Sequence, residues 1–300
     1  WWSKQKLKKP HKRKNKFYIY TNPVCTDRVF LYHIMKIAII GFGNMGQTYA
    51  NSFMSSGFVG ASDILILNKT KIEEKNCFGI DAANFYTEQN PQIFESDILI
   101  LAVKPQDFKQ LAAEIKAFLN PEHVILSVMA GISIEAMQME LGVSKIVRSM
   151  PNIPTQIGEG MTVFCASNAV DRKELFIVQN LINTTGKSIY IEKEEMLNAA
   201  TAVSGSGPAY VFYFMQAMIE SAIRLGFSPS EAEFLVSQTF SGSVQLQNRS
   251  KLSNEAWIQR VASKGGTTEA ALSVFNQKEL REIVIEGIEA ANTRAIELGS

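Results

Sequence analysis

A glycine-rich motif that follows the first strongly apolar run constrains the fold of this chain more than any other feature. The run KIAII at 36–40 predicts a strand buried on both faces, and it leads directly into GFGNMG at 41–46 and a helix-compatible stretch at 47–56. In such a unit the three glycines permit a tight turn, a close approach of the backbone to a pyrophosphate, and close packing of the helix on the strand. Turns also favour glycine, but this context indicates a dinucleotide site.

The second predicted strand, at 64–67, ends at a polar segment that bears on the choice of dinucleotide. Asn68, Lys69 and Thr70 follow it, roughly 20 residues beyond the last glycine, where an NAD-binding unit usually places an Asp or Glu for the ribose. An amide, an ammonium and a hydroxyl suit a 2′-phosphate better than a free hydroxyl, so the segment favours NADP(H). The alternative is a polar turn without a role in binding.

Strand and helix patterns alternate through the first half of the chain. Apolar runs at 97–103, 124–128 and 145–148 alternate with helical patterns at 106–118 and 132–141. The alternation predicts an α/β fold with a Rossmann-type doubly wound parallel sheet and right-handed crossovers. Ligands of such sheets bind outside the carboxyl ends of the strands.

The second half of the chain has a different pattern. After a last β-like segment at 188–191, strand signals disappear and helical patterns fill the rest, at 194–203, 208–225, 229–247, 255–262, 269–275 and 278–298. The pattern at 208–225 is apolar on nearly every side, which is typical of a helix buried in a subunit interface. We therefore expect a nucleotide-binding domain at 35–192 and an all-helical dimerisation and substrate domain at 193–300.

One turn in the second half carries more polar groups than packing requires. The segment SKGGTTE at 263–269 opens a helix and offers backbone N–H donors, hydroxyls and the positive end of that helix, which together suit a carboxylate. A simple N-cap supplied by Thr267 or Thr268 explains the same residues equally well. The physical chemistry of the sequence leaves these two interpretations open.

Charge is distributed unevenly along the chain. The 300 residues have a net charge of +1, but residues 1–34 hold nine Lys or Arg against one acid, and the remainder is mildly acidic. We expect this basic leader to be non-native or disordered, with Met35 as the natural start of translation. A transit peptide and a basic tail that binds nucleic acid are the alternatives, and the rest of the chain has no basic motif to support the second.

Composition argues against membrane proteins, disulfide-rich proteins and zinc proteins. No apolar stretch approaches the ~18 to 20 residues of a membrane helix, and three cysteines without a close pair argue against a disulfide framework or a zinc site. We therefore expect a soluble, cytoplasmic protein that binds neither membranes nor nucleic acid and holds no metal.

Five motifs together give the chain a resemblance to a known family. They are GFGNMG at 41–46, AVKPQ at 102–106, RSMPNIP at 148–154, TAVSGSGPAY at 201–210 and VASKGGTT at 261–268. In these residues, and over essentially all of 35–300, the chain resembles pyrroline-5-carboxylate reductase. The resemblance implies a Rossmann domain, a helical domain that dimerises by exchanging helices, and NAD(P)H-dependent reduction of 1-pyrroline-5-carboxylate to L-proline, the last step of proline biosynthesis. In some members of the family dimers assemble further into rings such as a decamer.

The resemblance also implies which residues bind the two ligands. Transferred position by position, the cofactor contacts fall on Gly41, Phe42, Gly43, Asn44, Met45, Gly46, Asn68, Thr70, Asn90, Ala102, Val103, Lys104 and Pro105. Lys69 joins this set through its chemistry, as the cation that suits a 2′-phosphate. The substrate contacts fall on Glu194, Ser263, Gly265, Gly266, Thr267 and Thr268. The chain departs from the family pattern at Ile153, where a Thr is usual, and at Lys264, where a Pro is usual.

Reduction of a cyclic imine requires a hydride donor, an anchor for the carboxylate and a proton on nitrogen. The cofactor supplies the hydride, so the protein contributes mainly positioning and electrostatics. We expect the backbone N–H groups of Gly266 to Thr268 and the hydroxyl of Ser263 to hold the carboxylate, and Thr268 to act at the imine nitrogen as the catalytic residue. His123, the only histidine after residue 34, is expected to be structural.

Two other functions fit parts of the sequence. A β-hydroxyacid dehydrogenase would place a catalytic Lys on the first long helix of the second domain, but no Lys occurs between Ala209 and Ile223. A non-catalytic NADPH-binding regulator would keep the first half of the chain, but it would not need the turn at 263–268.

Overall fold

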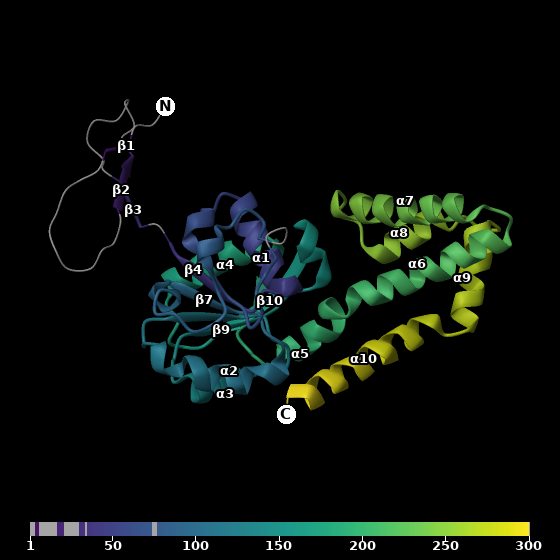
Figure 1. Cartoon of the computed structure of the whole chain (residues 1–300). Helices are drawn as coiled ribbons and strands as arrows, with labels where there is room; N and C mark the ends of the chain where they lie inside the picture. Colours follow the sequence, from purple (N-terminus) through teal and green to yellow (C-terminus); the bar gives the residue numbers. More distant parts are fainter. Residues whose placement is uncertain (1–3, 6–16, 21–29, 34, 74–76, 300) are drawn as a thin grey trace. The chain divides into compact units, whose positions relative to one another are not determined.

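The computed structural model describes residues 4–5, 17–20, 30–33, 35–73 and 77–299. The chain divides into two compact units, Trp1–Glu194 and Glu195–Ser300 (Figure 1). Most of the predicted leader lies outside the described residues, and the parts described are three short strands that pair antiparallel: β1 (Lys4–Gln5), β2 (Phe17–Tyr20) and β3 (Phe30–His33). That residues 1–34 are a non-native or disordered leader stays a prediction.

An eight-stranded sheet organises the first unit, in the order β11-β10-β9-β8-β7-β4-β5-β6. The strands are β4 (Ile37–Ile40), β5 (Ile64–Leu67), β6 (Phe85–Tyr86), β7 (Ile98–Leu101), β8 (Val124–Ser127), β9 (Ile146–Met150), β10 (Gly160–Ala166) and β11 (Gly186–Tyr190). β4 has β5 and β7 parallel to it on its two sides, which is the arrangement of a doubly wound sheet. The Rossmann-type fold predicted from the alternating pattern is therefore confirmed.

One strand departs from the predicted parallel sheet. β10, which is not among the strands that the sequence predicts, pairs antiparallel with β9 and parallel with β11. Residues 151–159 connect β9 to β10 and contain a 3-10 turn, Ile153–Ile157. A parallel crossover takes about a dozen residues or more, so this shorter connection favours the antiparallel pairing.

The α-helices of the first unit are α1 (Asn44–Ser55), α2 (Phe108–Ile115), α3 (Ile134–Leu141) and α4 (Arg172–Asn183). Helix α1 begins three residues before its predicted start, inside the glycine motif. Helix α4 is not among the predicted helices, although a capping box of Asp171 and Glu174 marks its start. In such a box each side chain accepts a hydrogen bond from the other residue's backbone N–H, which fixes the first turn of the helix.

The inner strands are apolar at every position because helices cover both faces of the sheet. All residues of β4, β5, β7 and β8 are buried. On one face, Tyr49 and Phe53 of α1 share a core with Ile37 of β4 and Val178 of α4, and Figure 1 shows α2 and α3 on the opposite side of the sheet. Each large apolar side chain buried in this way contributes ~1.5–3 kcal/mol to folding. The strand ends, and the loops they carry, are therefore held by a core that one chain completes by itself.

The second unit is helical throughout its described residues. Its elements are α5 (Met196–Ala200), a π-helical turn (Thr201–Gly205), α6 (Gly207–Arg224), α7 (Pro229–Asn248), α8 (Asn254–Val261), α9 (Thr267–Gln277) and α10 (Leu280–Gly299). The π-helical turn interrupts the continuous helix that the sequence predicts near 194–203. A single turn of this type is the usual form of π-helix in proteins. The all-helical class predicted for this half is confirmed.

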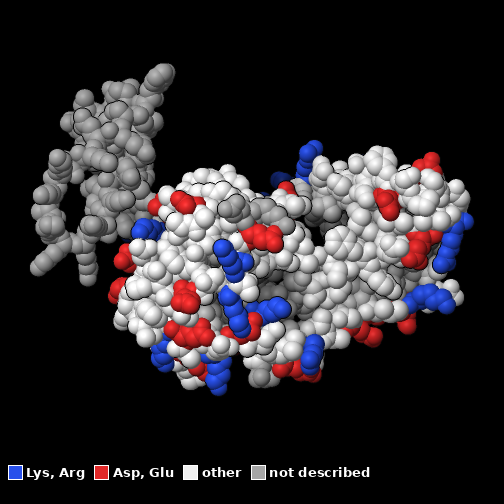
Figure 2. All heavy atoms as spheres, in the orientation of Figure 1, with Lys and Arg blue, Asp and Glu red and all other residues white. Residues whose placement is uncertain are grey.

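Few side chains of the second unit are buried. Among its described residues, the fully buried apolar ones are Leu197, Ala202, Ala232 and Val236. Large apolar side chains are exposed instead, Phe212 by 62% and Phe234 by 73%. Figure 2 shows that uncharged atoms dominate the middle of this unit on the face in view. Exposed apolar surface of this extent marks an interaction site. Among the residues that the structure describes, no helix is both long enough and apolar enough to cross a membrane.

Candidate active site

The glycine motif forms a tight turn at the carboxyl end of β4. Gly41 has a φ of +95°, and a Cβ at that position would lie 2.7 Å from the carbonyl oxygen of Ala102. A Cβ on Gly46 would collide with the carbonyl oxygen of Gly41. Both positions therefore require glycine, the first for the turn and the second for the packing of α1 against the loop.

The start of α1 is open toward a ligand. Gly43 is the N-cap residue, and no side chain caps this helix. Nothing lies within 4 Å of the position that a Cβ on Gly43 would occupy. The backbone N–H groups of Asn44, Met45 and Gly46 lack intrahelical acceptors and form the positive end of the helix dipole. The turn can therefore accept the pyrophosphate of a dinucleotide.

Asn68 connects the end of β5 to the glycine loop. Its Oδ1 accepts a hydrogen bond from the backbone N–H of Phe42 at 2.9 Å, and its Nδ2 donates to the carbonyl oxygen of Thr70 at 2.8 Å and to Oγ1 of Thr70 at 3.2 Å. The Asn68 amide thus holds the loop in shape. Lys69 and Thr70 are exposed, so they are the groups of this segment that face solvent and can meet a phosphate.

The tip that follows β7 lies beside the same loop. The backbone N–H of Ala102 donates to the carbonyl oxygen of Ile40 at 2.8 Å, and Lys104 is exposed at the start of a 3-10 turn that begins at Pro105. Asn90 belongs to a separate turn, in which its Oδ1 accepts from the N–H of Gln92 at 2.9 Å. The structure therefore brings the segments at 41–46, 68–70 and 102–103 together at one edge of the sheet.

The Glu194 carboxylate is engaged by the first unit. Its Oε1 accepts from Nη1 of Arg148 at 2.6 Å and from the backbone N–H of Ile134 at 2.9 Å. The resemblance implies a substrate contact for Glu194, whereas in the structure this oxygen binds Arg148 in the middle of β9 and the first residue of α3. Sequence reasoning missed Arg148 as its partner, and the 46 positions between the two residues give no local signal for the pairing.

The turn before α9 has the geometry of an uncapped helix start. Gly266 is the N-cap residue and no side chain caps α9, so the alternative in which Thr267 or Thr268 acts as the N-cap is wrong. Gly265 has a φ of +73°, and a Cβ on Gly266 would lie 2.6 Å from Oγ of Ser263. The two glycines therefore bring Ser263 close to the first N–H groups of α9, which begins at Thr267.

Two backbone donors of this turn already have acceptors, because the N–H of Gly266 donates to the carbonyl oxygen of Ser263 at 3.0 Å. The backbone N–H of Gly265 donates to Oε2 of Glu269 at 2.6 Å, so the chain's own carboxylate occupies a group that the resemblance assigns to the substrate. Sequence reasoning missed the role of Glu269, although an acid in the first turn of a helix is a recognisable signal. The N–H groups of Thr267 and Thr268 remain at the uncapped helix start. Lys264, one of the two departures from the family pattern, is exposed.

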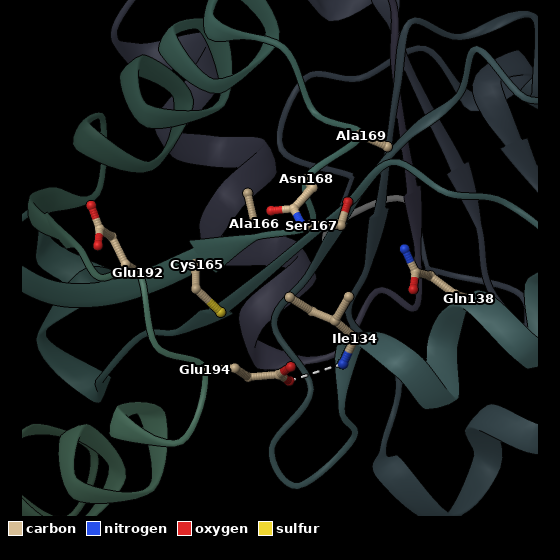
Figure 3. A pocket seen from close by; sticks show the side chains of 9 residues that line it. All are labelled: Ile134, Gln138, Cys165, Ala166, Ser167, Asn168, Ala169, Glu192 and Glu194. Atoms are coloured by element: carbon tan, nitrogen blue, oxygen red, sulfur yellow. Dashed lines mark hydrogen bonds between the residues drawn. The ribbon is translucent and has the colours of Figure 1, made fainter.

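An open hollow of about 450 Å³ lies elsewhere on the first unit, between α3 and the end of β10 (Figure 3). Glu194 stands at its edge and bonds to Ile134, and Glu192 and Asn168 are exposed around it. None of the residues that line the hollow belongs to the glycine loop, to the segment at 68–70 or to the segment at 102–105. The hollow is therefore separate from the strand ends at which the cofactor site is expected.

His123 is buried away from the strand ends that carry the glycine loop. One ring nitrogen lies 2.8 Å from the carbonyl oxygen of Phe94, and the other accepts from the backbone N–H of Asn120 at 3.1 Å. Burial lowers the pKa of His123 below its usual value of 6.5, so the ring is neutral at physiological pH. The geometry fits a structural residue.

Known proteins resemble both units of the chain. A family described as "Pyrroline-5-carboxylate reductase dimerisation" matches residues 194–298, and one described as "NADP oxidoreductase coenzyme F420-dependent" matches residues 36–131. A pyrroline-5-carboxylate reductase of Aquifex aeolicus is 32% identical over 265 residues, which cover 88% of this chain and 97% of the relative. The chain belongs to the pyrroline-5-carboxylate reductase family. The family predicted from the five motifs is therefore confirmed.

Solved structures of this family have the same fold. A pyrroline-5-carboxylate reductase from Coxiella burnetii is 31% identical, with a TM-score of 0.81 over 89% of this chain and 99% of its own. The Plasmodium falciparum pyrroline carboxylate reductase, solved with NADP bound, is 27% identical, with a TM-score of 0.79 over 89% of this chain and 98% of its own. The chain is thus an oxidoreductase that uses a nicotinamide cofactor, and its dimerisation domain makes it a homo-oligomer.

Proposed function

We propose that this chain reduces 1-pyrroline-5-carboxylate to L-proline with NADPH as the hydride donor. The observation that carries the proposal is the uncapped start of α9 at Gly266, in the unit that matches the family's dimerisation domain. A helix start without a side-chain cap offers free N–H donors that can bind a carboxylate. The substrate of this reaction is a cyclic imine that carries a carboxylate.

The first unit supplies the cofactor site. The N–H groups at the start of α1 hold the pyrophosphate, and the segments at 68–70 and 102–105 line the rest of the cofactor, with Asn90 beyond them. The nicotinamide supplies the hydride when it is bound. The protein's own contribution is to fix the loop, which it does through the Gly41 turn and the hydrogen bond from Phe42 to Asn68.

The second unit supplies the substrate site. The N–H groups of Thr267 and Thr268 and the hydroxyl of Ser263 hold the carboxylate. Gly265 and Gly266 shape the turn, and their own N–H groups donate to Glu269 and to the Ser263 carbonyl oxygen. Thr268 acts at the imine nitrogen as a hydrogen-bond partner or proton relay. Hydride adds to the imine carbon and the nitrogen keeps a proton. Because an imine nitrogen can be protonated before the hydride arrives, the reaction needs no histidine as general acid, which agrees with the structural setting of His123.

A preference for NADPH over NADH follows from the residues after β5. Position 68 is an amide where NAD-binding units place an acid, and Lys69 offers an exposed cation to a 2′-phosphate. The NADP in the Plasmodium falciparum relative supports the same choice. The dimer as the smallest assembly agrees with the exposed apolar helices, while a decamer, a cytoplasmic location and the absence of a nucleic-acid partner stay predictions from the resemblance and the composition.

Loss of NADPH absorbance on addition of 1-pyrroline-5-carboxylate tests the proposal, with NADH run in parallel. We expect substrate-dependent oxidation that is faster with NADPH at equal, subsaturating concentrations. A chain that binds NADPH but oxidises it no faster with the substrate than without it contradicts the proposed reaction. Faster oxidation of NADH contradicts only the cofactor preference.

A further inference from the structure

The junction between the two units is held by a carboxylate that contacts two distant parts of the first unit. Glu194 is the last residue of that unit, and α5 begins two residues later, at Met196. Its Oε1 accepts from Arg148 at 2.6 Å and from the N–H of Ile134 at 2.9 Å. One oxygen atom therefore joins the junction to β9 and to α3, and Figure 3 shows the contact with Ile134.

Arg148 is placed by the sheet. It lies in β9 two residues before the strand ends, paired with Cys165 of β10 and with Ser127 of β8. Its side chain is 10% exposed, against 29% for the side chain of Glu194. A guanidinium buried to this degree needs a partner, and Glu194 is that partner.

The start of α3 accepts the same carboxylate. Ser133 is the N-cap residue, and its Oγ accepts from the N–H of Ala136 at 3.1 Å. The N–H of Ile134 therefore remains available, and it donates to the carboxylate of Glu194, which lies 60 positions away in the sequence. A negative charge at a helix N-terminus is favourable, so the geometry binds Glu194 from two sides.

We propose that Arg148 and Glu194 form a positioning pair, which fixes the residue at which the chain leaves the nucleotide-binding unit. Turnover depends on the pair, although neither side chain contacts the reacting atoms. This inference rests on the proposed reduction, and it gives Glu194 a positioning role in place of the substrate contact that the resemblance implies. Hydride transfer is sensitive to placement, because an error of ~1 Å in the position of a reactant costs about 10²-fold in rate.

Kinetics of Arg148→Met, Glu194→Ala and the double variant test the pair. We expect each single variant to lower kcat by roughly tenfold or more, with the NADPH dissociation constant within about twofold of wild type. The double variant should be no slower than the slower single variant, because residues that act as a unit are not additive. If Glu194→Ala mainly raises KM for the substrate while Arg148→Met leaves it unchanged, Glu194 is a substrate contact and the inference is wrong.

Glu194→Gln separates hydrogen bonding from charge. The Gln oxygen can still accept from both Arg148 and Ile134, so we expect this variant to recover most of the kcat that Glu194→Ala loses. A Gln variant as slow as the Ala variant would indicate that the carboxylate charge acts on a cationic substrate, and it would overturn the positioning role.

A second ion pair next to the same strand provides a control. Lys145, just before β9 begins, bonds to Glu174 at 2.8 Å, with side-chain exposures of 17% and 19%, and to Glu122 at 3.0 Å. Glu174 also completes the capping box of α4, so its removal affects stability without touching the junction. We expect Glu174→Ala to lower the melting temperature about as much as Arg148→Met does, while kcat stays near the wild-type value. An equal fall of kcat in both variants would mean that general destabilisation explains the effect, and it would contradict the inference.

Limited trypsin digestion tests whether the positioning pair holds the junction, and it does not depend on the reaction. Lys193 is exposed directly before Glu194, and Arg148→Met leaves the sequence around this cleavage site unchanged. We expect cleavage after Lys193 to be faster in Arg148→Met than in wild type or Glu174→Ala, because loss of the pair frees the junction. Equal rates of cleavage after Lys193 in the three proteins would contradict the proposal that the pair holds the junction. If wild type does not reduce the substrate, the proposed function fails, but this measurement still decides whether the pair holds the junction.

Discussion

The two units of the chain differ in how much of their apolar surface a single copy can bury. The first unit covers both faces of its inner strands, and every residue of β4, β5, β7 and β8 is buried. The second unit has long helices, yet none of the residues in α6, α8, α9 or α10 is buried. The nucleotide site therefore stands on a core that one chain completes, whereas the helical unit needs a second copy to cover its surface.

The largest expected effect comes from a charge on the exposed surface of the helical unit. Phe212→Asp in α6 puts a carboxylate where a second copy would bury it, and an unpaired buried charge is costly. We expect the dimer to dissociate in sedimentation velocity, with loss of most activity. Phe176 of α4 is the matched control, because it is also a phenylalanine, 66% exposed against 62% for Phe212, but it lies in the unit that completes its own core. Dissociation by Phe176→Asp, or an intact Phe212→Asp dimer, would contradict the comparison.

Thr268→Ala tests the turn before α9. Loss of the hydroxyl should lower kcat by about 10²-fold, the usual scale for removing a group that acts in the transition state, with NADPH binding nearly unchanged. Thr239→Ala is the control, because that hydroxyl only donates to the carbonyl oxygen of Leu235 within α7. A wild-type rate for Thr268→Ala would rule out the assigned role.

Gly46→Ala and Gly43→Ala separate the two uses of glycine in the nucleotide loop. A Cβ on Gly46 collides with the Gly41 carbonyl oxygen, so we expect both a lower melting temperature and NADPH binding weakened by roughly tenfold or more, since such overpacking costs ~1–3 kcal/mol. A Cβ on Gly43 meets no neighbour, so that variant should keep its melting temperature and lose only NADPH affinity. Calorimetric unfolding and NADPH titration measure the two effects. A Gly43→Ala variant that binds NADPH normally would contradict the placement of the pyrophosphate.

Asn68→Asp sharpens the assignment of the cofactor. An Asp oxygen still accepts from the N–H of Phe42, although the two hydrogen bonds from Nδ2 to Thr70 are lost. The added charge favours a ribose hydroxyl over a 2′-phosphate. We expect the ratio of kcat/KM for NADPH to that for NADH to fall roughly tenfold, which corresponds to ~1.4 kcal/mol. An unchanged ratio would mean that residue 68 does not face the 2′ position.

The smallest expected effect is a pH dependence of stability in the first unit. The pKa of His123 is lower in the folded state because the ring is buried, so the unfolded chain binds the proton more tightly. The contribution of the neutral His123 ring to the free energy of unfolding is therefore complete above about pH 6.5. It is lost as the pH falls below that value, by at most ~1.4 kcal/mol for each pH unit. Urea unfolding of wild type and His123→Gln across this range measures it. A wild-type profile no steeper than that of the variant would contradict the neutral, buried ring.

The sequence predicts the parts of the fold that depend on local patterns. Buried parallel strands appear as short apolar runs, so β4, β5, β7, β8 and β9 are readily found, whereas the two-residue strand β6 is not. The glycine motif identifies the loop between β4 and α1. β10, with the sequence GMTVFCA, is not among the predicted strands, and its antiparallel pairing with β9 depends on the short connection at 151–159 and not on a local pattern. The all-round apolar pattern of α6 indicates that the second unit exposes apolar side chains. Which of these side chains are exposed depends on how its helices pack, and the sequence does not predict that.

In the candidate site, too, local sequence predicts some features and not others. Backbone features such as the Gly41 turn and the glycines before α9 follow from local sequence, because only glycine tolerates those conformations. Contacts between distant side chains do not, and Glu194 shows this most clearly, since its partners lie 46 and 60 positions away. Glu269 is an intermediate case, because it lies only four positions from Gly265 and helix-start acids are common enough to be recognised.

The formation of L-proline for each NADPH oxidised tests the central claim most directly. Purified dimer is incubated with 1-pyrroline-5-carboxylate and NADPH, and L-proline is quantified by chiral chromatography alongside the loss of NADPH absorbance. The reduction proposed for this chain predicts one L-proline for each NADPH, and Thr268→Ala should slow both signals equally. Oxidation of NADPH without L-proline, or binding of NADPH with neither signal, would contradict it.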